Sequence, residues 1–123
     1  MKDFSALMEI CRLDLGKPAD GDLEQRLNAL RDGGEDPDLA ALYFQFGRYL
    51  IVSGSMKNSS ALNLQGIWNA DFMPMWDSKY TININLQMNY WPAWVGNLME
   101  LHEPVMDLLE TMHEPGKKTA SVM

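Results

Sequence analysis

Charge is distributed very unevenly along this 123-residue chain, and this unevenness most limits what the chain can fold into. Residues 1–52 hold sixteen charged side chains and residues 100–123 hold seven, whereas residues 53–99 hold only Lys57, Asp71, Asp77 and Lys79. All four tryptophans and seven of the eight asparagines fall in this nearly neutral middle. We therefore expect the flanks to form solvated helices and the middle to form a surface that contacts something uncharged.

Apolar residues at helical spacing predict a mainly α chain. Residues 4–15 are expected to form one amphipathic helix that ends at Gly16 and Pro18, and residues 23–30 a shorter one that begins after Asp20 or Asp22. The clearest start lies in EDPDLAALYFQFGRYLIV, residues 35–52, and a last helix is expected from residue 103 to residues 115–116. No stretch shows a convincing hairpin turn, so no sheet is predicted.

The start of the third helix has a clear chemical basis. Asp36 is a plausible N-cap, Pro37 suits the first helical position, and Asp38 favours the positive end of the helix dipole. The apolar residues that follow give this helix one wide apolar face.

Composition disfavours several classes of partner. At 46% hydrophobic the chain can fill a core, and its net charge of −7 disfavours binding to nucleic acid or to anionic membranes. Charges in the first fourteen residues interrupt any signal peptide or membrane span. The single cysteine, Cys11, allows no internal disulfide, and His102 and His113 lie too far apart on one helix to share a metal ion. We therefore expect no metal site, and both histidines are interpreted as surface or capping residues. The sequence indicates no compartment.

Periodicity fails between residues 53 and 79. A loop of this length inside a compact protein is usually functional or disordered. Trp68 and Trp76 lie within it and argue against disorder.

The stretch KYTININLQMNYWP, residues 79–92, combines asparagines with apolar residues. In an extended segment Thr81, Asn83 and Asn85 would share one face, while two isoleucines anchor the other. The alternative is that these asparagines satisfy loop backbone groups or cap a helix that starts near Leu86.

Aromatic residues in the same region favour a carbohydrate site, because flat rings contact the apolar face of a sugar while amides bind its hydroxyls. Six residues supply that mixture: Trp68, Trp76, Tyr80, Tyr90, Trp91 and Trp94. The alternative is core burial, which is favoured for Trp91 and Trp94 beside an apolar helix. Trp68 and Trp76, in the loop, are the better candidates for substrate contact.

Four ordered motifs resemble a known family. ALYFQFGRYLIVSGS, NLQGIWN, WDSKYTININLQMNYWPA and NLMELHEPVMDLLETM are similar to the start of the catalytic domain of glycoside hydrolase family 95, the inverting α-L-fucosidases and their α-L-galactosidase relatives. The resemblance implies a fragment of an α/α barrel of six helical hairpins. Residues 1–34 would be linker helices before the barrel, and residues 35–123 its incomplete first part, which would need the missing parts of the same parent chain.

The resemblance also implies roles for individual residues. Asn83 and Asn85 match the asparagine pair that holds the attacking water, while the base and the acid lie further along the family's chain. The nearest carboxylates match neither of them: Asp71, Asp77, Glu100 and Glu103. No cofactor is implied, and the partner is an oligosaccharide substrate.

The chain departs from the family's pattern at Thr81, and also at Met75 and Asp77, where the family tends to have proline and glycine. Thr81 stands where fucose-specific members often have histidine, and threonine resembles members that accept L-galactose. The leading interpretation is a piece of an inverting exo-glycosidase that acts on terminal α-L-fucosyl or α-L-galactosyl residues. The rivals are a noncatalytic helical module that binds carbohydrate and an inactive gene fragment.

Overall fold

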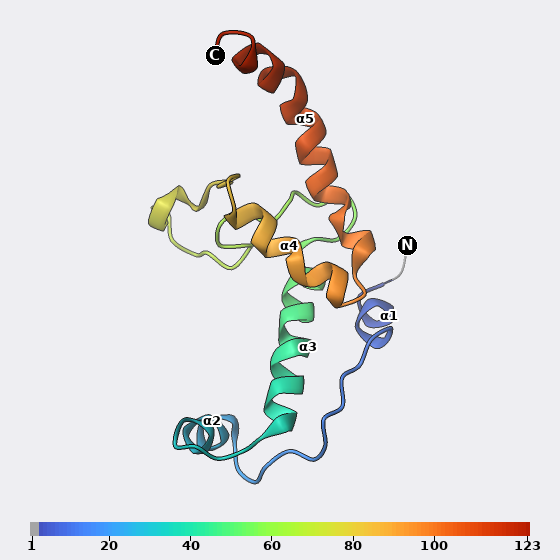
Figure 1. The fold of residues 1–123 in the computed structure, drawn as a ribbon, viewed down its shortest axis with the longest axis vertical. Coiled ribbons are helices and arrows are strands. Elements are labelled where there is room, and N and C mark those ends of the chain that lie inside the picture. The colour runs from blue at the N-terminus through green and yellow to red at the C-terminus, as the bar shows by residue number, and fades with distance from the viewer. Residues whose placement is uncertain (1–2) are drawn as a thin grey trace.

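The computed structural model describes residues 3–123 and is mainly helical, as predicted. In chain order its elements are α1 (Phe4–Glu9), α2 (Leu23–Arg31), α3 (Pro37–Gly54), the 3₁₀ turn η1 (Met75–Ser78), α4 (Asn85–Val95), the 3₁₀ turn η2 (Met99–His102) and α5 (Glu103–Ala120). The described residues contain no strand, only one isolated antiparallel bridge between Asn63 and Gly66. In Figure 1, α3 and α5 follow the long axis, α4 crosses between them, and the C-terminal end of α5 projects away from the other helices.

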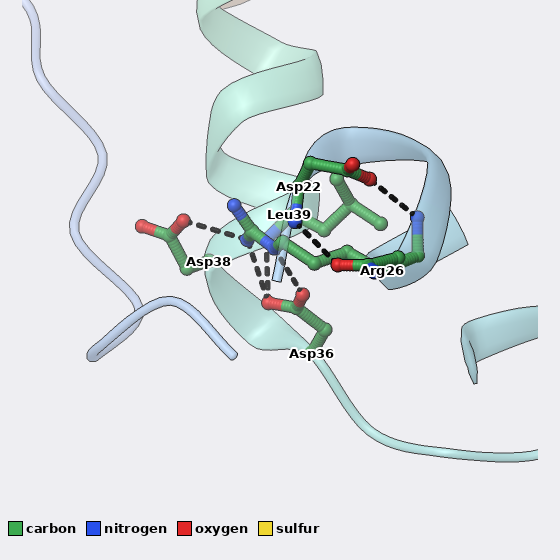
Figure 2. Close-up of polar contacts among 6 residues, drawn as sticks. Asp22, Arg26, Asp36, Asp38 and Leu39 are labelled. Atoms are coloured by element: carbon green, nitrogen blue, oxygen red, sulfur yellow. Dashed lines mark hydrogen bonds and ion pairs between the residues drawn. The ribbon is translucent and has the colours of Figure 1, made fainter. Parts of the chain in front are cut away.

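The start of α3 confirms the local prediction. Asp36 is the N-cap, its carboxylate accepts a hydrogen bond from the Leu39 amide at 3.1 Å, and Pro37 occupies the first turn. Arg26 of α2 donates two hydrogen bonds to the Asp36 carboxylate, at 2.7 and 2.9 Å, and one to Asp38 at 2.8 Å (Figure 2). These hydrogen bonds hold the pKa of the Asp36 carboxyl below its ordinary value. One guanidinium thus ties α2 to the N-terminus of α3.

The start of α2 is likewise as expected. Asp22 is its N-cap, and Asp22 and Gln25 form a reciprocal capping box through hydrogen bonds of 2.9 and 3.0 Å. This box satisfies two backbone donors at the end of a short helix that buries none of its residues.

Two apolar clusters hold the helices together. The first joins α1, α3, α4 and η2 through the buried residues Leu7, Ile51, Val52, Ala93, Leu98 and Leu101. The second places Ala61, Leu62, Leu86 and Tyr90 against Val105 and Leu108 of α5. The second cluster fixes the loop after α3 onto α4, so it positions the candidate site.

Arg48 is the charged residue at the centre of this packing, and sequence reasoning did not single it out. Its side chain is buried, with 1% of the residue exposed. Its guanidinium donates to the carbonyls of Leu7 (2.6 Å), Met8 (2.8 Å), Cys11 (2.8 Å) and Gly96 (2.9 Å), and also to a glutamine side chain. Arg48 therefore satisfies carbonyls at the C-terminal ends of both α1 and α4 from the middle of α3.

Two helix ends differ from the sequence prediction. The first helix ends at Glu9 rather than near Leu15, because the Arg48 guanidinium donates hydrogen bonds to the backbone carbonyls of Met8 and Cys11 at its end. The last helix continues through Pro115 to Ala120 rather than ending at residues 115–116. An interior proline removes one helical hydrogen bond and crowds the carbonyl four residues earlier, but it does not end the helix on this exposed segment.

Many large apolar side chains remain exposed on the helices. Tyr43 of α3 is 78% exposed, and on α4 Trp91, Trp94 and Val95 are 57%, 60% and 78% exposed. The expectation that Trp91 and Trp94 lie in the core was wrong for this chain, because α4 turns Tyr90 and Ala93 inward instead. Exposed apolar area of this extent marks surfaces that contact other protein or a ligand.

Candidate functional site

The turn that leads into α4 carries the predicted asparagine pair. The Thr81 carbonyl accepts a hydrogen bond from the Leu86 amide at 3.0 Å, and the Ile84 carbonyl accepts one from the Met88 amide at 2.9 Å. These bonds close a turn over residues 82–84, and Asn85 is the first residue of α4.

The prediction of an extended, alternating segment at this place was therefore wrong. Ile82 and Ile84 are 42% and 43% exposed and belong to neither apolar cluster, whereas Leu86 is 5% exposed and anchors the turn. The backbone hydrogen bonds that begin the helix outweigh the strand preference of two β-branched residues, because that preference depends on packing that this segment lacks.

The three asparagines of this stretch have different surroundings. The Asn89 amide donates to the carbonyl of Asn63 at 2.8 Å and so has a structural role. Within residues 3–123 the side chains of Asn83 and Asn85 form no hydrogen bond, and neither caps α4, whose N-cap is Ile84. Asn83 and Asn85 are therefore not caps of α4. Both amides keep their donors and acceptors available to a ligand.

The loop after α3 folds back beside this turn through four hydrogen bonds. The Leu64 amide donates to the Lys79 carbonyl at 3.2 Å, and the Tyr80 hydroxyl donates to the Ala61 carbonyl at 2.9 Å. Ser78 Oγ donates to Asn63 Oδ1 at 3.0 Å, and Asn89 reaches Asn63 from α4. Segments on either side of η1 therefore lie side by side.

Trp68 closes one side of a groove between this loop, α3 and α4. The indole is half-exposed and lies close to Gly54 and Gly66, where an added Cβ would come within 3.3 and 2.7 Å of its ring. The groove encloses about 420 Å³ and is lined by Gly47, Leu50, Ile51, Leu62, Leu64, Gln65, Gly66, Trp68, Met88, Asn89 and Pro92. Of the predicted site residues, only Trp68 lines it. Asn85 lies one helical turn before Met88 and Asn89 on the same face of α4.

Trp76 lies on a left-handed turn. The backbone φ angles of Trp76, Asp77 and Ser78 are +59°, +59° and +43°, a region that residues other than glycine seldom adopt. The Trp76 residue is 74% exposed. The turn thus presents an indole to solvent at the cost of backbone strain, and such strain concentrates at functional sites.

Two acidic residues near the site pair with lysines. Asp77 forms an ion pair with Lys79 at 3.2 Å, and Glu103 forms one with Lys57 at 2.9 Å. The hydrogen bond to Glu103 raises the pKa of the Lys57 amine. The carboxylate side chains of Asp77 and Glu103 are 81% and 41% exposed.

Tyr90 and His102 hold the loop and α5 against α4. Burial raises the pKa of Tyr90, whose hydroxyl lies 2.8 Å from Ser55 Oγ and accepts from the Leu62 amide at 2.8 Å. His102 Nε2 accepts a hydrogen bond from Trp94 Nε1 at 2.9 Å, and burial lowers the pKa of His102. His102 occupies the N-cap position of α5, in line with the prediction of a capping residue, although its side chain forms no cap hydrogen bond and is partly buried beside Trp94. His113 is exposed, as predicted.

Residues 3–123 lack two further kinds of feature. Among residues 3–123 no group of three or more histidine, cysteine or carboxylate side chains could hold a metal ion. None of the described helices is long and apolar enough to cross a membrane.

Comparison with known proteins identifies a family and several relatives. The glycosyl hydrolase family 95 catalytic domain matches residues 1–123. Alpha-L-fucosidase 2 of Arabidopsis thaliana is 49% identical over 88 residues, which cover 72% of this chain and 10% of that protein. Probable alpha-fucosidase A of Aspergillus oryzae is 38% identical over 130 residues, covering 100% of this chain and 18% of that protein. The Aspergillus niger protein of the same name is 36% identical over 127 residues, with 100% and 16% covered. The chain thus spans less than a fifth of these relatives.

Proposed function

This chain belongs to the family of the glycosyl hydrolase family 95 catalytic domain, and from that premise we propose that it contributes part of the substrate site of an inverting exo-glycosidase. The substrate class is a terminal α-L-fucosyl or α-L-galactosyl residue on an oligosaccharide. The names of the three relatives, all alpha-fucosidases, support the fucosyl side of this proposal.

The observation that carries the proposal is the contrast among three neighbouring asparagines. Asn89 is engaged by the Asn63 carbonyl, whereas the amides of Asn83 and Asn85 have no hydrogen-bond partner in residues 3–123. In the proposed role Asn83 and Asn85 orient the attacking water by accepting its hydrogen bonds. A neutral amide is too weakly basic to take the proton of that water, so a carboxylate from outside this chain completes the step.

Two exposed indole rings are suited to contact with the apolar face of a sugar. Trp68 and Trp76 present half-exposed and largely exposed rings from the loop that packs beside the asparagine turn. In the proposed site these rings contact the apolar face of the sugar, and Thr81 lies near its variable hydroxyl. Inversion requires base and acid on opposite faces of the sugar with space for water between them, which this arrangement leaves to the rest of the enzyme.

The proposed fold follows from membership of the same glycosyl hydrolase family. Residues 1–34 act as linker helices, and residues 35–123 form the opening part of an α/α barrel whose other helices come from further sequence. The exposed apolar residues of α3 and α4 support this, because Tyr43, Trp91 and Val95 would be covered by neighbouring barrel helices.

A chimera tests the activity. The matching segment of the full-length Aspergillus oryzae relative is replaced by residues 1–123, and hydrolysis of an aryl α-L-fucoside is measured with the product anomer followed by NMR. We expect turnover with inversion, and a loss of kcat of about a hundredfold or more in Asn83→Ala and Asn85→Ala chimeras. The control is Asn28→Ala on α2, which should retain activity because α2 lies at the opposite end of α3 from α4 (Figure 1) and the Asn28 side chain bonds Arg31. Full activity in the Asn83→Ala and Asn85→Ala chimeras would contradict the proposal.

Taken alone, the 123-residue chain should hydrolyse no α-L-fucoside above background. Holding a water supplies positioning, but the leaving oxygen must then depart without a proton, and general acid and base catalysis are each worth about a hundredfold to ten-thousandfold. Turnover by the purified chain that vanishes in Asn83→Ala would place an acid among these residues, and Asp71 and Asp77 would be the first to replace.

A further inference from the structure

Asn63 lies where three segments of the candidate site meet. Its carbonyl accepts from the Asn89 side chain of α4 at 2.8 Å and from the Gly66 amide at 3.1 Å. Its Oδ1 accepts from the Gln65 amide at 3.0 Å and from Ser78 Oγ at 3.0 Å. One residue thus bonds the Trp68 loop, the last residue of η1 and the helix that follows the asparagine pair.

The bond to Ser78 holds a strained segment. Three consecutive left-handed residues cost about 1–2 kcal/mol each relative to the right-handed conformation. Within the turn itself, the Asp77 amide donates to the Pro74 carbonyl at 3.1 Å. Two hydrogen bonds connect the turn to the loop after α3. Ser78 Oγ donates to Asn63 Oδ1, and the Leu64 amide donates to the carbonyl of Lys79, the residue that follows the turn. Asn63 and its neighbour therefore determine where the turn sits.

Trp68 depends on the same residue from the other side. The Asn63 side chain and carbonyl bond Gln65 and Gly66, which shape a tight turn just before Trp68. Gly66 has φ +66°, and a Cβ added there would lie 2.7 Å from the Trp68 ring. The position of the Trp68 indole is therefore set by the turn that Asn63 closes.

We propose that Asn63 is a positioning residue whose Oδ1 holds the Trp76 turn against the Trp68 loop, so that the two indoles keep a fixed relative placement. This inference rests on the proposed function, because a fixed placement of the two indoles affects binding when both rings contact one sugar. Binding energy in such a site depends on rings that are ordered before the ligand arrives.

The chemistry of Oδ1 supplies a matched pair of variants. Both side-chain bonds of Asn63 use Oδ1 as an acceptor, so Asn63→Asp keeps both bonds with nearly the same shape. Asn63→Leu keeps the approximate size and removes the acceptor. Ser78→Ala breaks one of these bonds from the opposite side and leaves Asn63 in place.

The test uses the 123-residue chain labelled with ¹⁵N-tryptophan. Its four indole N–H signals are assigned by single tryptophan-to-phenylalanine variants. We expect Asn63→Leu to shift the Trp76 and Trp68 signals, and Asn63→Asp to restore their wild-type positions. The Trp94 signal is the internal control for folding, because this indole donates to His102 in another part of the chain.

Ser78→Ala should shift the Trp76 signal alone, and the double variant should add little to Asn63→Leu, since the two residues share one bond. Trp76 and Trp68 signals that stay in place in Asn63→Leu, with Trp94 unchanged, would overturn the proposal. Failure of Asn63→Asp to restore them would also overturn it, because Oδ1 would then not be the group that acts.

Titration with L-fucose separates this inference from the proposed function. Loss of one or two hydrogen bonds that order the site should weaken the Kd of Asn63→Leu by about three- to tenfold relative to wild type. If no variant and no wild-type signal responds to L-fucose, the proposed function fails in this chain while the indole shifts still support the positioning role. If wild type responds and Asn63→Leu binds equally well with unmoved signals, the positioning role is wrong while the proposed function stands.

Discussion

Replacing Arg48 by methionine should strongly lower the free energy of unfolding of the chain. The change keeps an unbranched apolar stem and removes the guanidinium, which bonds the carbonyls of Leu7, Met8, Cys11 and Gly96. An unsatisfied buried polar group costs about 1–3 kcal/mol, but removing a buried charge also removes its desolvation penalty. Because four carbonyls lose their donor, their summed cost should exceed the penalty removed, and the net loss expected is about 3–5 kcal/mol, a large share of the roughly 5–15 kcal/mol that holds a typical domain folded.

Urea denaturation followed by far-ultraviolet circular dichroism measures this loss. With a slope of about 1–3 kcal/mol per molar urea, the midpoint should fall by more than about 1 M. Arg48→Lys keeps the charge but not the planar fork, so it should lose an intermediate amount. The control is Arg31→Met, which removes an exposed guanidinium that bonds the Asn28 side chain and should change stability by less than about 0.5 kcal/mol. A loss below about 1 kcal/mol in Arg48→Met would refute the reasoning.

Three further predictions follow from single contacts. Hydrogen bonds from Arg26 lower the pKa of Asp36 below its ordinary 3.8, so the stability they give is present above that pH and is lost as pH falls through the lower folded pKa. Asp36→Asn should therefore remove this part of the acid dependence of thermal unfolding, and an unchanged dependence would contradict the assignment. Tyr90→Phe should cost about 1–3 kcal/mol in chemical denaturation, because a buried backbone amide and Ser55 lose their partner, and an unchanged midpoint would count against it. Thr81→His in the chimera should raise kcat/KM for L-fucosides relative to L-galactosides by crowding a 6-hydroxyl, and equal ratios before and after would exclude that role.

Helix starts could be predicted because their chemistry is local. Asp22 and Asp36 bond amides only three residues away, and Pro37 needs no partner at all. The end of α1 could not be predicted from neighbouring residues, because the group that satisfies its carbonyls comes from Arg48, about forty residues later. A donor at that separation leaves no local signal in the sequence.

The candidate site shows the same division. Residue type and order made the asparagines candidates, but three asparagines within seven residues look alike in a sequence. Asn89 differs from the other two only through Asn63, twenty-six residues earlier. The segment around Asn83 was assigned to an extended conformation because isoleucine favours strands, yet that preference depends on a packed face, and the turn leaves both isoleucines exposed.

The side chains that stabilise the fold differ from those of the candidate site. Loss of activity can therefore be distinguished from loss of stability. Arg48 and Tyr90 are buried and hydrogen-bonded, so their substitution should lower the free energy of unfolding. Asn83 and Asn85 contribute no hydrogen bond within residues 3–123, and exposed or half-exposed positions of this kind usually change stability by less than about 0.5 kcal/mol when substituted. A chimera that carries Asn83→Ala and melts like its parent, but turns over substrate a hundredfold more slowly, would therefore have lost a group that acts on the substrate or its water rather than one that supports the fold.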